Sequence, residues 1–260
     1  MTDYMKISII GGTGGMGEGF ALRWVVNHDI TIGSRDAQKA VNSAEQYMNT
    51  ALTSYGNSMR GTIKGADYIS SSRDSDILIL SIPYESIKLT CDSISNEIKN
   101  DCIIVSPIVP MERNDFGFTY IPFEKTMKSA ARILAENLPG KKIVSAFHTI
   151  SEVKLKNITE SLDSDTFVCG DDQEAVEKLN QLIAEIKGLR PLYLGSLSLS
   201  YQAEVLTPML LNASKKNKIK HPGIKLTWTR FKLGMQMIST TRIGCTEWEY
   251  YLLWWLQLLH

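Results

Sequence analysis

The stretch Ile7-Ser-Ile-Ile-Gly-Gly-Thr-Gly-Gly-Met-Gly17 places a short apolar run directly before glycines in the spacing Gly12-x-Gly14-x-x-Gly17. In a dinucleotide-binding strand–helix–strand unit, the first glycine makes a tight turn and the second lets backbone N–H groups approach a pyrophosphate. The third allows the helix to pack closely on the strand. The residues that follow have helical character, so the order of elements is the required one. The sequence therefore predicts a dinucleotide site, with the pyrophosphate at a helix N-terminus.

The end of the next predicted strand indicates which dinucleotide is bound. Residues 30–32 lead into Ser34 and Arg35, with no carboxylate at the tip to accept the ribose 2′-hydroxyl of NAD. Arginine can instead pair bidentately with a 2′-phosphate. Ser34 and Thr13 add hydroxyl donors, and Lys39 lies about one helical turn beyond Arg35 as a second cation. This pattern favours NADP.

Two observations leave room for other interpretations of this strand end. Asp36 is an acidic residue close to the expected ribose, although a carboxylate at this position also suits the start of a helix. Ser34, Arg35 and Lys39 are also compatible with a solvated helix start that binds nothing.

Composition excludes several classes of function. At 260 residues and 43% hydrophobic content, the chain can bury a substantial core. Lys plus Arg and Asp plus Glu balance at 28 each, so no global positive field attracts nucleic acid or an anionic membrane. The four cysteines lack the spacing of a zinc site or disulfide framework, and no apolar stretch reaches the roughly 20 residues that span a bilayer. We expect a cytoplasmic protein that binds small molecules, without metal, membrane or nucleic acid.

Alternating strand and helix patterns predict an α/β fold, a Rossmann-type doubly wound, mainly parallel sheet with a smaller C-terminal α/β lobe. Strands are predicted at residues 62–65, 76–83, 102–105, 142–147, 166–169 and 191–194. Helices are predicted at residues 36–51, 85–99, 124–138, 173–187 and 198–216. Residues 109–122 are expected to form a long irregular loop, either functional or a surface loop held down by its aromatic residues.

The predicted elements divide the chain into three parts. Residues 1–150 form the NADP-binding domain, residues 151–227 the smaller lobe, and residues 228–260 a tail that carries four of the five tryptophans. The long helix of the lobe either caps a substrate crevice or pairs subunits, and we expect a homodimer or higher homo-oligomer. The tail is compatible with a membrane interface, with burial against a partner subunit or with an extension of the reading frame.

Two strand ends bring further candidates to the edge of the sheet where ligands of such folds bind. The tip that follows the apolar run 76–83, at residues 81–84, carries Ile82 and Tyr84. The run 142–147 delivers His148 and Ile150 to the same edge. A single histidine in this place is either a structural hydrogen-bonding residue or part of a reactive site.

From Met5 to Leu226 the chain resembles the F420-dependent NADP reductases, both in its motifs and in their order along the sequence. These enzymes move a hydride between NADPH and the 8-hydroxy-5-deazaflavin coenzyme F420. The resemblance is carried by I-G-G-T-G-G-M-G, G-S-R with a following lysine, I-P-Y-E, V-S-P-I-V-P, G-F-T-Y, S-A-F-H-T-I, V-C-G-D-D, G-L-R-P-L and L-T-P-x-x-L-N. It implies that NADP and coenzyme F420 are both bound, with direct hydride transfer between them and no catalytic triad or metal.

The resemblance also implies a role for each part of the site. The residues implied for the 2′-phosphate are Thr13, Ser34, Arg35 and Lys39. Those implied for the pyrophosphate are Gly12, Thr13, Gly14, Gly15, Met16 and Gly17. Ile82, Tyr84 and Val109 would line the nicotinamide, His148 and Ile150 would border the deazaflavin ring, and Pro222 would lie in the region that closes over the rest of that coenzyme.

The chain departs from the family pattern in its tryptophan-rich tail, residues 228–260, which has no counterpart in the family, and at two places before it. Leu197-Ser-Leu-Ser-Tyr201 stands where the family commonly shows an L-S-N-x-R stretch, and Tyr84 stands where tryptophan is expected. These changes keep two alternatives open: an NADP-dependent reductase of another small acceptor, or an NADP-binding regulatory protein without turnover.

Overall fold

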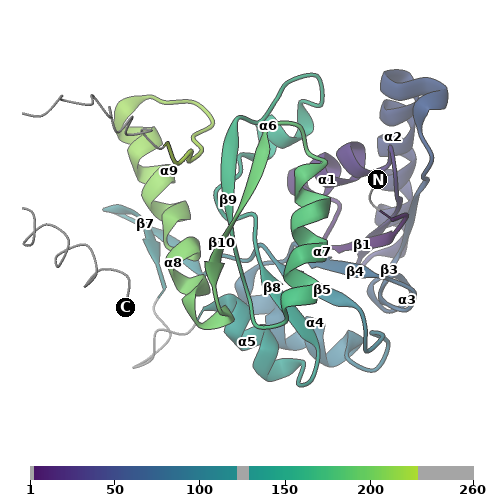
Figure 1. The fold of residues 1–260 in the computed structure, drawn as a ribbon, viewed down its shortest axis with the longest axis horizontal. Helices are drawn as coiled ribbons and strands as arrows, with labels where there is room; N and C mark the ends of the chain where they lie inside the picture. The colour runs from purple at the N-terminus through teal and green to yellow at the C-terminus, as the bar shows by residue number, and fades with distance from the viewer. Residues whose placement is uncertain (1–2, 122–128, 228–260) are drawn as a thin grey trace, which may run out of the picture. The chain divides into compact units, whose positions relative to one another are not determined.

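An eight-stranded sheet in the order β10-β9-β8-β5-β4-β1-β2-β3 forms the centre of the fold (Figure 1). The computed structural model describes residues 3–121 and 129–227. The strands are β1 (Lys6–Ile10), β2 (Asp29–Ser34), β3 (Ile63–Asp67), β4 (Ile77–Leu80), β5 (Ile103–Ser106), β8 (Lys142–Ser145), β9 (Ser164–Gly170) and β10 (Leu189–Gly195). Neighbouring strands are parallel except at the β8–β9 pair, which is antiparallel. The expected α/β fold with a mainly parallel sheet is therefore confirmed.

Helices cover both faces of this sheet, as in a doubly wound fold. One face packs against α1 (Gly15–Trp24), α2 (Ala37–Tyr55), α6 (Glu152–Lys156) and α7 (Gln173–Ala184). The other face packs against α4 (Ile87–Ile94) and α5 (Ala130–Asn137). The start of α5 was expected at residue 124, but residues 122–128 lie outside the described part of the chain.

The core beneath α1 explains why the glycine loop is held firmly. Phe20 and Trp24 stack with ring centroids 4.8 Å apart, and Phe147 meets Phe20 edge-on at the same distance. The indole N–H of the fully buried Trp24 donates to the carbonyl of Leu182 at 3.1 Å, so its polar atom is satisfied. These contacts fix α1 on the strand end that carries His148.

β9 and β10 add two strands to the same sheet and are joined by α7. Within this part of the chain, the side chain of Arg190 makes two bonds of 2.7 Å to the carboxylate of Asp165. The division at residue 150 stays a prediction, and the tail 228–260 lies outside the described residues.

The segment after β5 is not the irregular loop that was expected. It forms an antiparallel hairpin of β6 (Met111–Asn114) and β7 (Gly117–Tyr120). The side chain of Asn114 accepts a bond from the Phe116 backbone N–H at 3.0 Å, and Gly117 has a φ of 132°, a conformation that favours glycine. A turn signal was present, but the alternation of apolar and polar residues that marks a strand was weak.

The single helix expected at residues 198–216 is broken into three pieces. These are the 3₁₀ turn η3 (Leu197–Leu199), α8 (Ser200–Glu204) and α9 (Leu206–Asn217). Pro208 explains the break between α8 and α9, because its ring conflicts with the carbonyl four residues earlier and it has no N–H to donate to Glu204. In Figure 1, α9 stands beside β7, and the Asn212 side chain exchanges bonds of 2.8 Å and 2.7 Å with the backbone of Phe118.

Candidate functional site

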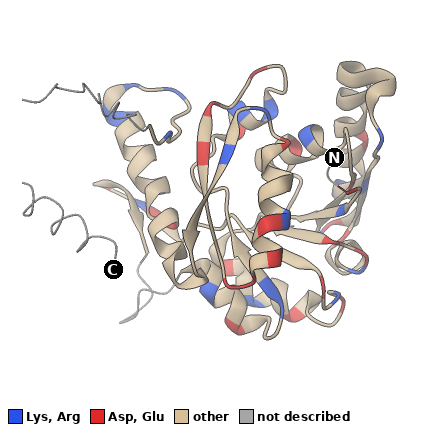
Figure 2. Cartoon of the chain, viewed as in Figure 1, with Lys and Arg blue, Asp and Glu red and all other residues tan. Residues whose placement is uncertain are grey.

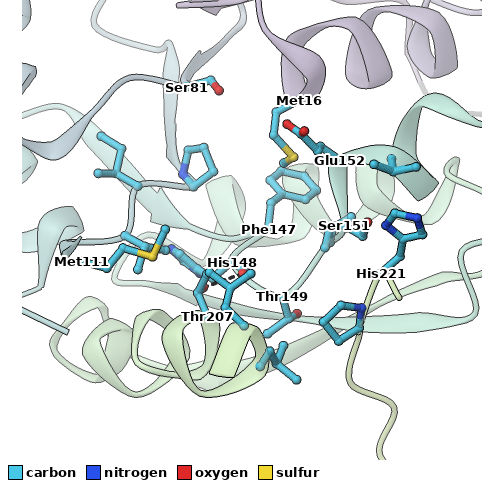
Figure 3. A pocket seen from close by; sticks show the side chains of 18 of the residues that line it. Met16, Ser81, Met111, Phe147, His148, Thr149, Ser151, Glu152, Thr207 and His221 are labelled. Atoms are coloured by element: carbon cyan, nitrogen blue, oxygen red, sulfur yellow. Dashed lines mark hydrogen bonds between the residues drawn. The ribbon is translucent and has the colours of Figure 1, made fainter. Parts of the chain in front are cut away.

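A cavity of about 630 Å³ opens where the carboxyl ends of the central strands meet α9. A cavity of this size is in the range of small-molecule sites. Figure 3 shows Met16 entering it from the start of α1, with His148 and Thr207 on the opposite side. Six of the candidate residues line this cavity: Met16, Ile82, Val109, His148, Ile150 and Pro222. The fold thus brings together side chains from five separate segments of the sequence.

The three glycines of the motif differ in what surrounds them. A Cβ at Gly12 would meet the Ile9 carbonyl at 2.7 Å, and one at Gly17 would meet the Gly12 carbonyl at 2.2 Å, so the fold itself excludes a side chain at both. A Cβ at Gly14 would meet nothing within 4 Å. The backbone of Gly14 is extended and does not require glycine. The open space over Gly14 fits a ligand that approaches the backbone closely, as a pyrophosphate does.

The glycine loop is tied to the tip of β2. The backbone N–H groups of Gly11 and Gly12 both donate to the Gly33 carbonyl, at 3.0 Å and 3.2 Å. The residues after Gly33 are therefore held beside the loop, and the half-buried Thr13 belongs to the same corner. The cationic side chains of Arg35 and Lys39 are exposed here.

The two carboxylates near Arg35 are engaged as helix caps. Asp36 accepts the Lys39 backbone N–H at 3.0 Å at the start of α2, and Ser34 accepts the Asp36 backbone N–H at 3.2 Å. Asp67 accepts the backbone N–H of Ser70 at 2.8 Å at the start of α3 (Tyr68–Ser72). That bond also lowers the pKa of the Asp67 carboxyl. Across residues 3–121 and 129–227, Arg35 forms no ion pair.

A second cavity, of about 360 Å³, lies next to this cation. It is lined by Arg35 and Tyr68 on one side and by the loop after β4 on the other. Ile82 and Pro83 line both cavities. The two cavities are therefore adjacent along the edge of the sheet, with the cation at one end.

His148 is the most unusual polar group of the larger cavity. His148 is 5% exposed, and neither nitrogen of its ring has a hydrogen-bond partner within the described residues. Burial lowers the pKa of the imidazole to about 4, an effect that the nearby backbone of Ser106 partly opposes. The ring is therefore neutral at neutral pH, with one nitrogen free to donate and the other to accept. Buried polar groups are rarely left unpaired, so the ring fits a ligand with hydrogen-bonding atoms.

The backbone around His148 is fixed from both sides. The Thr207 hydroxyl of α9 donates to the His148 carbonyl at 2.7 Å. The preceding residue, Phe147, has a φ of 74°, and its backbone N–H donates to the Thr166 hydroxyl at 2.8 Å. A non-glycine residue in this left-handed region is uncommon and is held by such surrounding contacts.

Not every candidate side chain lines a cavity. Tyr84 lies in the 3₁₀ turn η2 (Tyr84–Ser86) and packs against the apolar cluster under α4 and α5. Thr13, Ser34 and Lys39 lie at the corner between the glycine loop and β2, outside the walls of both cavities. Their roles stay predictions.

Several cavity residues were missed by sequence reasoning. Glu152 comes from α6, a helix too short to give a periodic signal, and Met111 comes from the unexpected hairpin. Thr207 belongs to the L-T-P motif of the family resemblance, and this motif could have pointed to a polar residue in the cavity wall. His221 lines the cavity through a loop in which it has a φ of 53°.

The described cysteines are not reactive candidates. Cys91, Cys102 and Cys169 are free and buried, and burial raises their thiol pKa values to about 11, 12 and 12. Cys245 lies outside the described residues.

The described part of the chain contains no group of three His, Cys, Asp or Glu residues placed to hold a metal. None of the helices in this part meets the length and hydropathy needed to cross a bilayer.

Known proteins are similar to this chain over most of its length. The family described as "NADP oxidoreductase coenzyme F420-dependent" matches residues 6–110. The F420-dependent NADP reductase of Methanocaldococcus jannaschii is 34% identical over 229 residues, which cover 86% of this chain and 98% of that protein. The F420-dependent NADP reductase of Methanothermobacter thermautotrophicus is 31% identical over 228 residues, 86% of this chain and 95% of that protein.

Among solved structures, a protein of Arthrobacter sp. FB24, described provisionally as an F420-dependent NADP-reductase, aligns with a TM-score of 0.71 at 18% identity. The alignment covers 86% of this chain and all of that one. At this identity the likeness concerns the fold alone.

Proposed function

The chain belongs to the F420-dependent NADP reductase family, and we propose that it is an oxidoreductase that transfers a hydride between NADP(H) and coenzyme F420 by direct contact of the two bound molecules. The observation that carries this proposal is the cavity that joins Met16 of the glycine loop to the unpartnered, neutral ring of His148. One end of it is built for a dinucleotide, and the other offers hydrogen bonds to a second ligand.

The dinucleotide end is supported by the open space over Gly14 and by the free cation beside it. We propose that the pyrophosphate lies over Gly12, Gly14 and Gly17, where α1 presents backbone N–H groups. Arg35, which has no ion pair in the described chain, then meets the 2′-phosphate. Asp36 already caps α2 through one carboxylate oxygen, whereas Arg35 pairs with no carboxylate among the described residues. This supports NADP over NAD.

The second end is supported by the walls around His148. Ile82, Val109 and Ile150 line the cavity and provide apolar surface for flat rings. The neutral imidazole can hydrogen-bond a polar edge of the deazaflavin without contributing a charge. We therefore assign His148 to the orientation of the second coenzyme and not to general base catalysis.

The chemistry needs little more from the protein than positioning. The two coenzymes supply the reacting carbons, and these must be held about 3–3.5 Å apart in the correct orientation. The apolar residues of the cavity press the rings together and exclude water, which would otherwise compete for hydrogen bonds at the reacting edge. Thr207 maintains this geometry through the His148 backbone.

The departure from the family pattern at residues 197–201 does not favour another acceptor. Leu197 is buried with the apolar cluster under α4 and α5, and its backbone N–H donates to the Asp171 carboxylate at 3.0 Å. Among the described residues that line the two cavities, none comes from this stretch.

The finer organisation is also part of the proposal. We propose that residues 151–227 act as a lobe that closes the deazaflavin site, supported by Thr207, Leu210 and Leu211 of α9 in the cavity wall. We propose a cytoplasmic homo-oligomer, supported by the free, buried cysteines and by the exposed Met209 on α9 and Phe116 at the hairpin tip.

Turnover of the two coenzymes tests this function. Purified protein is mixed with NADPH and oxidised F420, and the absorbance of the oxidised deazaflavin is followed. Loss of that absorbance with stoichiometric oxidation of NADPH is expected. Oxidation of NADPH by simple imines or carbonyls but not by F420 would support a different reductase, and NADPH binding without turnover would support a regulatory protein.

A further inference from the structure

Positive charge is concentrated in one segment of this neutral chain. Residues 205–227 contain five lysines and one histidine but no aspartate or glutamate, whereas the whole chain balances 28 basic against 28 acidic residues. Figure 2 shows basic residues, coloured blue, at the end of α9 and in the loop that follows it. We refer to Lys215, Lys216, Lys218 and Lys220 as the lysine segment.

The lysine segment lies at the mouth of the larger cavity. Ser214 precedes it and His221 and Pro222 follow it, and all three line the cavity. Lys218 ends α9 in a left-handed conformation, with a φ of 55°, which turns the chain back toward the sheet. The segment is therefore held against the opening by the fold and is not a free tail.

The return of the chain is anchored beyond the lysines. The Asp165 backbone N–H donates to the Ile224 carbonyl at 2.7 Å, and the Leu226 backbone N–H donates to the Asp165 carboxylate at 2.6 Å. Arg190 donates to the Leu226 carbonyl at 2.7 Å. These bonds fix the loop at β9, so the position of the lysine segment relative to the cavity is defined.

The charges of the lysine segment are not neutralised within the described residues. Lys225 pairs with Asp163, but none of the four lysines of the segment forms an ion pair in residues 3–121 and 129–227. All four are exposed. Like charges held together at a cavity mouth raise the local concentration of anions, and the effect weakens with salt.

We propose that the lysine segment binds the anionic side chain of the deazaflavin coenzyme, a phosphodiester followed by carboxylates. This inference rests on the proposed function. The phosphates of NADP are assigned to the glycine loop and to Arg35, on the other side of the cavity. A ring seated at His148 must send its side chain out through the mouth, where the lysines stand. The same cations would contribute nothing to a deazaflavin that ends at its uncharged ribityl group.

The test compares two electron acceptors in the full chain. One is coenzyme F420, and the other is the deazaflavin truncated at the ribityl group, without phosphate or glutamate. The variant is Lys218→Gln with Lys220→Gln, and its matched control is Lys64→Gln with Lys187→Gln, two exposed lysines away from both cavities.

The variant should raise KM for F420 by roughly 3–10-fold, the scale of two exposed ion pairs, and should reduce the dependence of this KM on salt. KM for the truncated deazaflavin and for NADPH should stay unchanged, as should all values of the control. An unchanged KM for F420, an equal rise for the truncated acceptor, or a rise for NADPH instead would overturn the assignment. If the unmodified protein reduces neither deazaflavin, the proposed function fails as well. If it reduces both and the lysines have no effect, only the present inference fails.

Discussion

The carboxylate of Glu152 lies directly against Gly15, so that a Cβ on this glycine would meet Oε2 at 2.8 Å. Gly15 is the first residue of α1, where the pyrophosphate is assigned. The contact is set by the packing of α6 alongside α1. A Cβ at Gly19 would meet the Leu155 side chain at 2.6 Å, and Arg23 donates to the Leu155 carbonyl at 2.7 Å. A negative charge is thus held beside the position of the dinucleotide phosphates.

Replacing Glu152 with glutamine should therefore tighten NADPH binding. Two like charges about 4 Å apart in water repel by about 1 kcal/mol, so Kd should fall about fivefold. Isothermal titration calorimetry of Glu152→Gln measures this, with the exposed Glu160→Gln as the matched control. Weaker binding in Glu152→Gln would show that the carboxylate accepts hydrogen bonds from the ligand instead.

Replacing Arg35 with alanine should separate the two nicotinamide dinucleotides. The guanidinium is assigned to the 2′-phosphate, and a hydrogen bond to a charged group is worth about 1.5–3 kcal/mol. NADPH binding should weaken by that amount, while NADH binding changes little. The comparison is made by titration calorimetry with both nucleotides, and equal losses for the two would contradict the 2′-phosphate assignment.

Replacing His148 with phenylalanine should affect the second coenzyme alone. A flat aromatic ring is kept but both nitrogens are lost, so KM for F420 should rise by about 2–10-fold, equivalent to about 0.5–1.5 kcal/mol for one hydrogen bond. The Kd of NADPH should stay as it is. Steady-state kinetics and calorimetry give the two values, and an unaltered KM for F420 would remove His148 from the deazaflavin site.

Glu204 should make the stability of the protein depend on pH. It is fully buried and accepts bonds from the Tyr120 hydroxyl at 2.9 Å and from the Ala130 and Ala131 backbone N–H groups at 3.0 Å and 3.3 Å. Burial nevertheless raises the pKa of its carboxyl to about 7. The folded protein then holds a proton that the unfolded chain, with a pKa of about 4.3, releases.

Because the folded protein binds this proton more tightly than the unfolded chain does, a higher pH destabilises the fold. The stability that this proton contributes is present below about pH 4 and is lost as the pH rises through about 7. The free energy of unfolding should therefore fall between pH 5 and pH 8, and Glu204→Gln should reduce that fall. Urea unfolding at several pH values measures both. An identical pH dependence in the two proteins would mean that Glu204 is charged in the fold throughout this range.

Much of the architecture was accessible from sequence because its signals are local. The apolar run of β4 is buried at all four positions, as expected for a central strand, and the glycine spacing marked the start of α1. The surroundings of Arg35 were predictable for the same reason, because the end of β2 and the helix cap at Asp36 lie within a few residues of it in the sequence.

The remaining parts of the site depend on contacts between residues far apart in the chain. The place of Glu152 depends on bonds from Arg23 to carbonyls more than 130 residues away. The hairpin is docked by Asn212, whose side chain pairs with a backbone segment 94 residues earlier. No periodic pattern encodes such contacts, so the walls of the cavity became visible only in the folded chain.

Isotope transfer tests the central claim most directly. The protein is incubated with oxidised F420 and with NADPH that carries deuterium on the transferring face of its nicotinamide C4, and the reduced F420 is analysed by mass spectrometry. Direct transfer between two adjacent rings predicts that the deuterium appears on the deazaflavin ring. Reduced F420 without deuterium, or no reduction at all while NADPH is bound, would contradict the account.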